Sequence, residues 1–203
     1  MLLSSDEFHS WRARTPTPCG PVREAQVRIE RDRDVVRIEL NRPDRRNAFG
    51  HAMRDQLLEA LAVAETDSTV TRVVLSGAGP AFCSGGDLAE FGSAGSPALA
   101  HLLRLQTSVG MVVHRLRRRV QPVLHGACIG AGIEIPSFAD HLVAREGAWF
   151  QLPEVGMGLI PGAGGTVSLP RRIGRWRTAY MALSRRRIPL DLALDWGLVD
   201  ARA

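Results

Sequence analysis

Two glutamates, Glu134 and Glu154, are the residues of this chain whose type and spacing best suit chemistry. Each belongs to a glycine-rich segment, GACIGAGIE at Gly126–Glu134 and LPEVGMGLIPGAGG at Leu152–Gly165. When two carboxyl groups converge on one pocket, one can accept a proton while the other donates one, whereas a lone carboxyl can only shuttle a proton. The pairing therefore predicts acid–base chemistry, provided that the fold brings the two side chains together.

Each glutamate also has a purely structural interpretation. Glu134 could lie in the first turn of a helix, where a carboxylate favours the helix dipole. Pro136 supports that placement, because proline is tolerated in a first turn and not in a helix interior. Glu154 follows Pro153 and could be a solvated loop acid. The two residues alone leave these interpretations open.

Two glycine-rich segments, at 77–86 and 126–132, each follow a predicted strand and precede a predicted helix. Glycine lets a ligand approach the backbone, and the first amides of a helix point outward unpaired. Two such segments facing each other could donate two amide hydrogen bonds to one oxygen, which is an oxyanion hole. Taken alone, either segment could equally be a tight turn. A phosphate-binding P-loop is excluded, because its motif needs a lysine and all 26 basic residues are arginines.

The elements that must position these residues alternate between strands and helices. Alternating apolar and polar residues predict a hairpin from Gln26–Glu30 and Val35–Leu40. Apolar residues at helical spacing from Met53 to Ala64 predict a helix of about four turns. Further along, we expect a strand at 73–75, a helix at Pro97–Arg117, a strand at Val120–Leu124, strand fragments at 142–144 and 148–151, and helical stretches from 174 to 197. This alternation indicates the α/β class.

Two proline-containing segments indicate where regular structure is interrupted. Pro122 within the strand at 120–124 predicts that the strand is short or that the Pro122 nitrogen is unpaired. The sequence TPTPCGP at Thr15–Pro21 blocks regular structure, so we expect residues 1–24 to form a poorly ordered N-terminal arm. Residues 25–203 then form a single core domain.

Composition bounds the function classes. With 203 residues, 45% of them apolar, the chain can bury one core, and no apolar run approaches the roughly 18 residues of a membrane span. The first ten residues lack the pattern of a secretory signal, so a cytoplasmic location is expected. Three cysteines, Cys19, Cys83 and Cys128, form no metal-ligand pattern, so we expect free thiols and no metal. The net charge of +5 reflects coding bias or a partner that carries phosphates.

Five segments together resemble the enoyl-CoA hydratase/isomerase, or crotonase, superfamily. They are LNRPDRRNAF at 40–49, VVLSGAGPAFCSGGDLAEF at 73–91, VLHGACIGAGIE at 123–134, FQLPEVGMGLIPGAGGTVSLPRRIG at 150–174 and ALDWGLVD at 193–200. The resemblance implies a crotonase-like spiral of ββα units, a coenzyme A thioester as substrate, no permanently bound cofactor, and a homo-oligomer, a trimer or hexamer. Family members usually continue for several tens of residues beyond the GLVD segment as helices over the acyl group, whereas this sequence ends at Ala203.

The resemblance also implies roles for individual residues. The backbone amides of Gly86 and Ala131 would form the oxyanion hole, with alanine at a position where glycine is common. In hydration of a 2-enoyl-CoA, Glu134 would take a proton from water and Glu154 would deliver one to the α-carbon. Six residues from two stretches of the chain would lie along the coenzyme: Arg45, Arg46, Ala48, Ser84, Asp87 and Leu88. The two arginines could contact phosphate or simply be solvated.

Three other functions remain open at this point. An enoyl-CoA isomerase would move a double bond with one main carboxylate, and a non-catalytic acyl-CoA-binding homologue would bind without turnover. Some crotonase relatives bind RNA, and the chain has arginine runs at 115–119, 171–177 and 185–187. Beyond Trp176, no stacking aromatic residues accompany these runs, so we interpret them as solvated helix faces or CoA phosphate contacts rather than a nucleic-acid surface.

Overall fold

The computed structural model describes residues 25–93, 96, 98, 102 and 106–203, so the arm expected at 1–24 lies outside the described residues. The larger of two sheets has six strands in the order β1-β2-β3-β4-β6-β9. Their bounds are Val27–Asp32, Val35–Leu40, Arg72–Gly77, Val120–Leu124, Val143–Ala144 and Ala201–Arg202. The hairpin β1–β2 is antiparallel and every later pairing in this sheet is parallel, as the crossover helices require.

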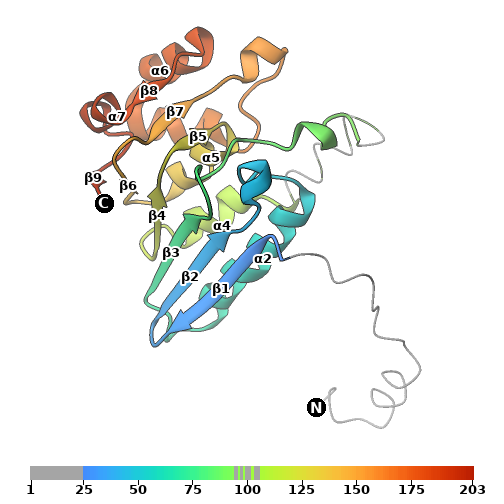
Figure 1. Cartoon of the computed structure of the whole chain (residues 1–203), viewed down its shortest axis with the longest axis vertical. Helices are drawn as coiled ribbons and strands as arrows, with labels where there is room; N and C mark the ends of the chain where they lie inside the picture. Colours follow the sequence, from blue (N-terminus) through green and yellow to red (C-terminus); the bar gives the residue numbers. More distant parts are fainter. Residues whose placement is uncertain (1–24, 94–95, 97, 99–101, 103–105) are drawn as a thin grey trace.

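A smaller sheet has the order β5-β7-β8, with bounds Ala127–Ile129, Trp149–Gln151 and Ile188–Pro189. Twice the chain leaves the large sheet and enters the small one within a few residues, from β4 to β5 and from β6 to β7. A helical segment follows each step. These two strand–strand–helix turns wind the chain into a spiral, with the small sheet at the end of the molecule opposite the β1–β2 hairpin (Figure 1).

Helices cover the sheets and close the core. Their bounds are His51–Thr66 for α2, Val109–Arg115 for α4, Ala131–Glu134 for α5, Gly165–Ser184 for α6 and Leu190–Trp196 for α7. Short 3₁₀ helices lie at Pro43–Arg45 (η2), Leu88–Glu90 (η3), Pro136–Phe138 (η4) and Glu154–Met157 (η5). The apolar stripe predicted for α2 is buried, with Met53, Leu57 and Leu61 at most 2% exposed, and it packs against the large sheet (Figure 1).

Two predicted helices differ from those observed. The helix expected at Pro97–Arg117 is interrupted, because Thr107 and Ser108 are not helical and the Ser108 hydroxyl caps the start of α4 by accepting a hydrogen bond from the Met111 amide. Part of the expected span lies outside the described residues. The helical tail begins at Gly165 rather than 174, and Gly174 has the non-helical angles φ 81° and ψ 159° that divide α6 into two segments.

Pro122 lies where strand β4 changes its neighbour. The first three residues of β4 pair with β3, ending at the Leu75–Pro122 pair, and Val123 and Leu124 pair with β6. The strand is five residues long, as expected for one that contains proline. Among the described helices, none combines the length and the apolar character that crossing a bilayer requires.

Candidate active site

The two glycine-rich segments run side by side in parallel. Cys83 and Cys128 face each other in a parallel bridge, in which the Cys83 amide donates to Ala127 O at 3.2 Å and the Ile129 amide donates to Cys83 O at 3.0 Å. The approach depends on Gly132, since a Cβ atom there would overlap the carbonyl oxygen of Cys83. The two glycine-rich segments therefore lie side by side, which is the arrangement that an oxyanion hole requires.

In this parallel register the two predicted oxyanion donors occupy matching positions relative to the bridge. Gly86 and Ala131 each lie three residues beyond one of the paired cysteines. The Phe49 amide donates to Gly85 O at 2.8 Å and the Asp87 amide to Phe49 O at 3.1 Å, so the Gly86 amide between them points away from Phe49. Ala131 is the first residue of α5, where an amide has no acceptor within its own helix. Neither amide is directed into the bridge or the helix of its own segment.

Glu154 begins η5, and its carboxylate lies on the backbone of Gly130. A Cβ at residue 130 would be 3.6 Å from Glu154 Cδ and would overlap Oε1. Glu154 Oε2 is buried, and the described part of the chain offers it no hydrogen-bond partner. Burial raises the pKa of Glu154 above the usual range of a glutamate. Glu154 is thus half-buried in a 3₁₀ helix rather than fully solvated in a loop.

Glu134 ends α5 and is 1% exposed. Its Oε2 accepts hydrogen bonds from the amides of Ala163 and Gly165, both at 2.8 Å, at the start of α6. The Ser168 hydroxyl donates to the main-chain oxygen of Glu134 at 2.8 Å. Glu134 is in the first turn of α5, as expected, and its carboxylate also lies at the positive end of a second helix, an environment that favours negative charge.

Both glutamates contact Gly130, Glu134 through its main chain and Glu154 through its side chain. The Glu134 amide donates to Gly130 O at 2.9 Å, while the Glu154 carboxylate covers the Cα atom of Gly130. The next residue is Ala131, whose amide is one of the two candidate donors. The Glu154 carboxylate therefore lies beside the turn that precedes the Ala131 amide, and the main chain of Glu134 closes that turn.

The residues predicted to lie along the coenzyme gather beside the first glycine segment. Ser84 donates to Arg46 O at 2.9 Å through its amide and to Arg45 O at 3.4 Å through its hydroxyl. The Ala48 amide donates to Arg45 O at 3.1 Å. The guanidinium of Arg45 and the side chain of Leu88 are solvent-exposed, 70% and 63% respectively. These residues surround an accessible surface next to Gly86.

Asp87 is placed differently from its neighbours. Its carboxylate is engaged by the protein, with Oδ2 2.6 Å from Arg42 NH1 and Oδ1 accepting from the Ala89 amide at 3.1 Å. The hydrogen bond from Arg42 is the main reason that the pKa of Asp87 lies below its ordinary value. Arg42 and the fully buried Asn47 are polar residues that the sequence interpretation missed. Asparagine tolerates a positive φ, and this property in a tight loop is the signal that could have identified Asn47.

Comparison with known proteins gives a family match and several relatives. The family model described as Enoyl-CoA hydratase/isomerase matches residues 30–202. The chain is 34% identical over 179 residues to the 2,3-dehydroadipyl-CoA hydratase of Escherichia coli (strain K12), covering 87% of this chain and 68% of that protein. It is also 34% identical over 172 residues to the 1,2-epoxyphenylacetyl-CoA isomerase of the same organism, covering 83% and 66%.

Solved structures show the same fold. A crystal structure of enoyl-CoA hydratase from Mycobacterium smegmatis superimposes with a TM-score of 0.81 at 32% identity, covering 89% of this chain and 70% of that one. Another, from Thermoplasma volcanium GSS1, gives a TM-score of 0.80 at 32% identity, covering 88% and 71%. The chain thus spans about two thirds of the length of these relatives. The predicted spiral is confirmed, and the chain belongs to the enoyl-CoA hydratase/isomerase family of the crotonase superfamily.

Proposed function

We propose that this chain adds water to 2-enoyl-CoA thioesters. The observation that carries the proposal is the position of the Glu154 carboxylate against Gly130, the residue before Ala131, with the buried Glu134 three residues beyond Ala131. This arrangement supports a site in which a thioester oxygen is held by two amides while two carboxyl groups reach the adjacent carbons. The family membership and the hydratases among the relatives support the same substrate class.

The proposed reaction divides the proton transfers between the two carboxyl groups. The amides of Gly86 and Ala131 bind the thioester oxygen and stabilise the enolate that forms as water attacks the β-carbon. Glu134, as a carboxylate, takes the proton that water loses. Glu154, as the acid, delivers a proton to the α-carbon on the same face, so that one water molecule is added. The raised pKa of Glu154 suits the donor, because it keeps the acid form populated at higher pH.

Crotonyl-CoA tests this proposal directly. Hydration removes the conjugated double bond, so the ultraviolet absorbance of the thioester should fall when the protein is added. Glu134→Gln and Glu154→Gln should each slow the reaction by roughly 10²–10⁴-fold, the usual contribution of a general acid or base. Absence of any absorbance loss at high protein concentration would contradict hydration. Binding of crotonyl-CoA without turnover would instead identify a non-catalytic acyl-CoA-binding homologue.

An isomerase is the second candidate, and the environment of Glu134 favours it. Because Glu134 Oε2 is bound by two backbone amides, Glu154 is the carboxyl group with an unpartnered oxygen among the described residues. One such group suffices to move a proton between two carbons of a 3-enoyl-CoA. If wild type gave no hydration and Glu134→Gln retained turnover of a 3-enoyl-CoA, the isomerase would be the correct assignment.

We also propose that the chain forms a homo-oligomer, a trimer or hexamer. Helix α6 supports this assembly through large apolar side chains that one chain leaves exposed, Trp176 at 75%, Leu183 at 70% and Tyr180 at 44%. Light scattering of the purified protein measures the mass directly. A monomer at micromolar concentration would contradict the assembly without affecting the catalytic proposal.

A further inference from the structure

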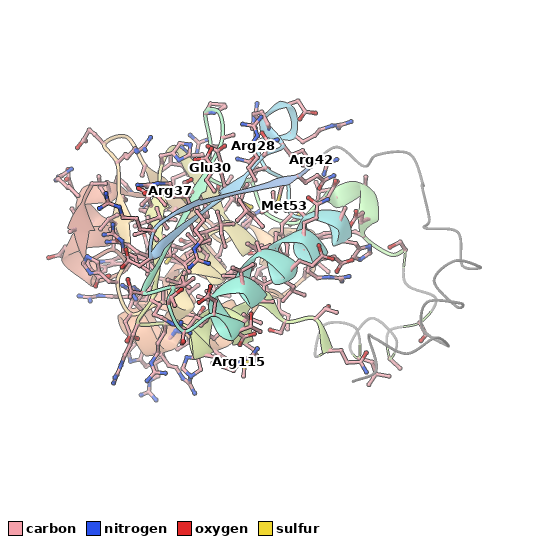
Figure 2. The ribbon with its side chains drawn as sticks, turned by 90° about the horizontal axis from the view of Figure 1, so that it is seen from below. Arg28, Glu30, Arg37, Arg42, Met53 and Arg115 are labelled. Atoms are coloured by element: carbon pink, nitrogen blue, oxygen red, sulfur yellow. The ribbon has the colours of Figure 1, made fainter. Side chains whose placement is uncertain are left out.

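A single ion pair lies immediately after the first oxyanion donor. Arg42 NH1 is 2.6 Å from Asp87 Oδ2, and the two side chains are only 24% and 15% exposed. Arg42 belongs to the loop between β2 and α2, and Figure 2 shows it near the start of α2, beyond the end of the strands that carry Arg28, Glu30 and Arg37. Asp87 follows Gly86 directly. The pair therefore joins this loop to the residue next to the proposed donor.

A buried asparagine fixes the backbone of Arg42. Asn47 is fully buried, and its Oδ1 accepts a hydrogen bond from the Arg42 amide at 2.8 Å. Its Nδ2 donates to the main-chain oxygens of Ala78, Ala81 and Phe82 at 2.9, 2.9 and 3.1 Å. Asn47 therefore attaches the loop of Arg42 to the glycine segment that carries Gly86. A buried side chain with all these bonds made is rigid.

Arg42 also approaches the peptide group that orients the Gly86 amide. Gly85 C=O and Gly86 N–H belong to one planar peptide, and Gly85 O accepts from the Phe49 amide at 2.8 Å. The Phe49 N–H in turn shares a planar peptide with Ala48 C=O, which lies 3.5 Å from Arg42 NH1. The Arg42 guanidinium thus makes two contacts near the Gly86 amide. One is with Asp87, the next residue, and the other is with the Ala48–Phe49 peptide, which is hydrogen-bonded to Gly85 O.

We propose that Arg42 is a positioning residue that sets the direction of the Gly86 amide through its contacts with Asp87 and Ala48. The consequence for catalysis rests on the function proposed above. The energy of an oxyanion donor depends on its direction toward the oxygen, and small displacements in a site reduce rates strongly. Loss of Arg42 should therefore lower kcat while leaving the fold and the binding of the coenzyme unchanged.

The first experiment needs no substrate. In ¹⁵N-labelled protein, Arg42→Gln should shift the Gly86 amide resonance, and Arg42→Lys should restore it in part because lysine keeps the charge. Arg31→Gln is the matched control, since Arg31 forms a pair of the same 2.6 Å length with Asp67, at the start of the loop between α2 and β3. A Gly86 resonance that moves no more in Arg42→Gln than in Arg31→Gln would overturn the proposal, whatever the protein does with thioesters.

The second experiment measures the consequence with butyryl-CoA and crotonyl-CoA. In wild type, hydrogen bonds from the two main-chain amides should lower the carbonyl stretching frequency of bound butyryl-CoA in infrared difference spectra. Arg42→Gln should reverse part of this shift and lower kcat for crotonyl-CoA roughly ten- to a hundredfold, with KM within about twofold. The double variant Arg42→Gln/Asp87→Asn should lose little more than either single variant.

The outcomes separate the two proposals. A wild type that binds neither thioester contradicts the proposed function, and the Gly86 resonance still decides the role of Arg42. A wild type that turns over crotonyl-CoA, with an Arg42→Gln variant of equal kcat or unchanged carbonyl frequency, overturns the positioning role alone. A loss of activity that merely follows a loss of folded protein, measured by urea denaturation, also overturns it.

Discussion

The carboxylate of Glu154 rests on Gly130, in the space that any side chain larger than hydrogen would occupy at residue 130. The two residues come from different strand–strand–helix turns of the spiral, and the small sheet joins them, because the Gly130 amide donates to Gln151 O at 3.0 Å. Glycine at 130 is therefore a requirement of the neighbouring carboxyl group as well as of its own backbone, which has φ 50°.

We expect Gly130→Ala to displace Glu154 and lower the rate of crotonyl-CoA hydration by roughly 10²-fold. The added Cβ would overlap Oε1, and a positive φ also strains alanine. Gly147→Ala separates the two effects, because Gly147 has φ 79° and a Cβ there would meet nothing within 4 Å. Equal losses in the free energy of unfolding for the two variants, together with equal hydration rates, would show that the contact with Glu154 has no catalytic importance.

Gly165→Ala should disturb Glu134 in a similar way. A Cβ at residue 165 would lie 2.5 Å from Glu134 Cγ and 2.9 Å from Oε2. Because the surroundings are closely packed, we expect a loss of about 1–3 kcal/mol in the free energy of unfolding, together with slower hydration. Thr166→Ala, on an exposed position of the same turn, should be neutral in urea denaturation and in turnover. Equal behaviour of the two variants would contradict the packing of Glu134 described above.

Glu154→Gln should stabilise the protein at neutral pH while abolishing most activity. A raised pKa means that the folded state binds a proton more tightly than the unfolded state, so Glu154 costs stability once pH exceeds the ordinary glutamate pKa of 4.5. The variant should be more stable than wild type near pH 7, and the gain should be small because the carboxyl group is only partly buried. The gain should vanish below pH 4. Thermal denaturation across this range, with exposed Glu59→Gln as control, measures the effect; a gain independent of pH would refute it.

Arg45 and Arg46 should contribute to coenzyme binding without contributing to chemistry. Both are exposed beside Ser84, so their replacement leaves the fold unchanged. We expect the double variant Arg45→Gln/Arg46→Gln to raise KM for crotonyl-CoA several-fold at low salt, with kcat unchanged, because contacts to phosphate are uniform between substrate and transition state. Added salt should reduce the difference. A KM equal to that of wild type at low salt would show that the two arginines are only solvated.

Cys83 and Cys128 should be inert in the folded protein. Burial raises the pKa of Cys83 to about 12, and the Cys128 pKa is raised for the same reason. The reactive thiolate is thus almost absent at neutral pH. Iodoacetamide should leave both thiols unmodified in the native protein and modify both in urea, as peptide mass spectrometry can show. Modification of either residue in the native state would contradict their burial.

Periodic and local patterns were sufficient for much of the fold. Helix α2 and the hairpin β1–β2 were predicted because one face of each is apolar at a regular spacing, and that pattern depends only on nearby residues. The break before α4 was missed because Ser108 competes for the backbone through its hydroxyl, an effect that apolar spacing does not report. The boundary expected at Gly174 is present, since its non-helical angles separate two segments of α6, but the helical segment that begins at Gly165 was missed.

The candidate site was predictable in membership but not in its contacts. The motifs identified Glu134 and Glu154, and the structure places the Glu154 carboxylate against Gly130 and the Glu134 carboxylate at the start of α6. The amides that bind Glu134, at Ala163 and Gly165, lie about 30 residues away, so only the folded chain shows that the carboxylate meets a second helix. The same holds for Arg42 and Asp87, which are 45 residues apart.

The parallel bridge between Cys83 and Cys128 determines which changes the proposed oxyanion hole can survive. Its two donors are main-chain amides at matching steps from that bridge, so most side-chain substitutions there leave a donor in place. Inserting or deleting one residue between 83 and 86 would turn the Gly86 amide to the opposite side of its segment, and the same change between 128 and 131 would shift the start of α5 relative to the bridge. The proposed hole therefore depends on segment length as well as on the glycines at 130 and 132, and a one-residue insertion or deletion within either three-residue step should abolish it.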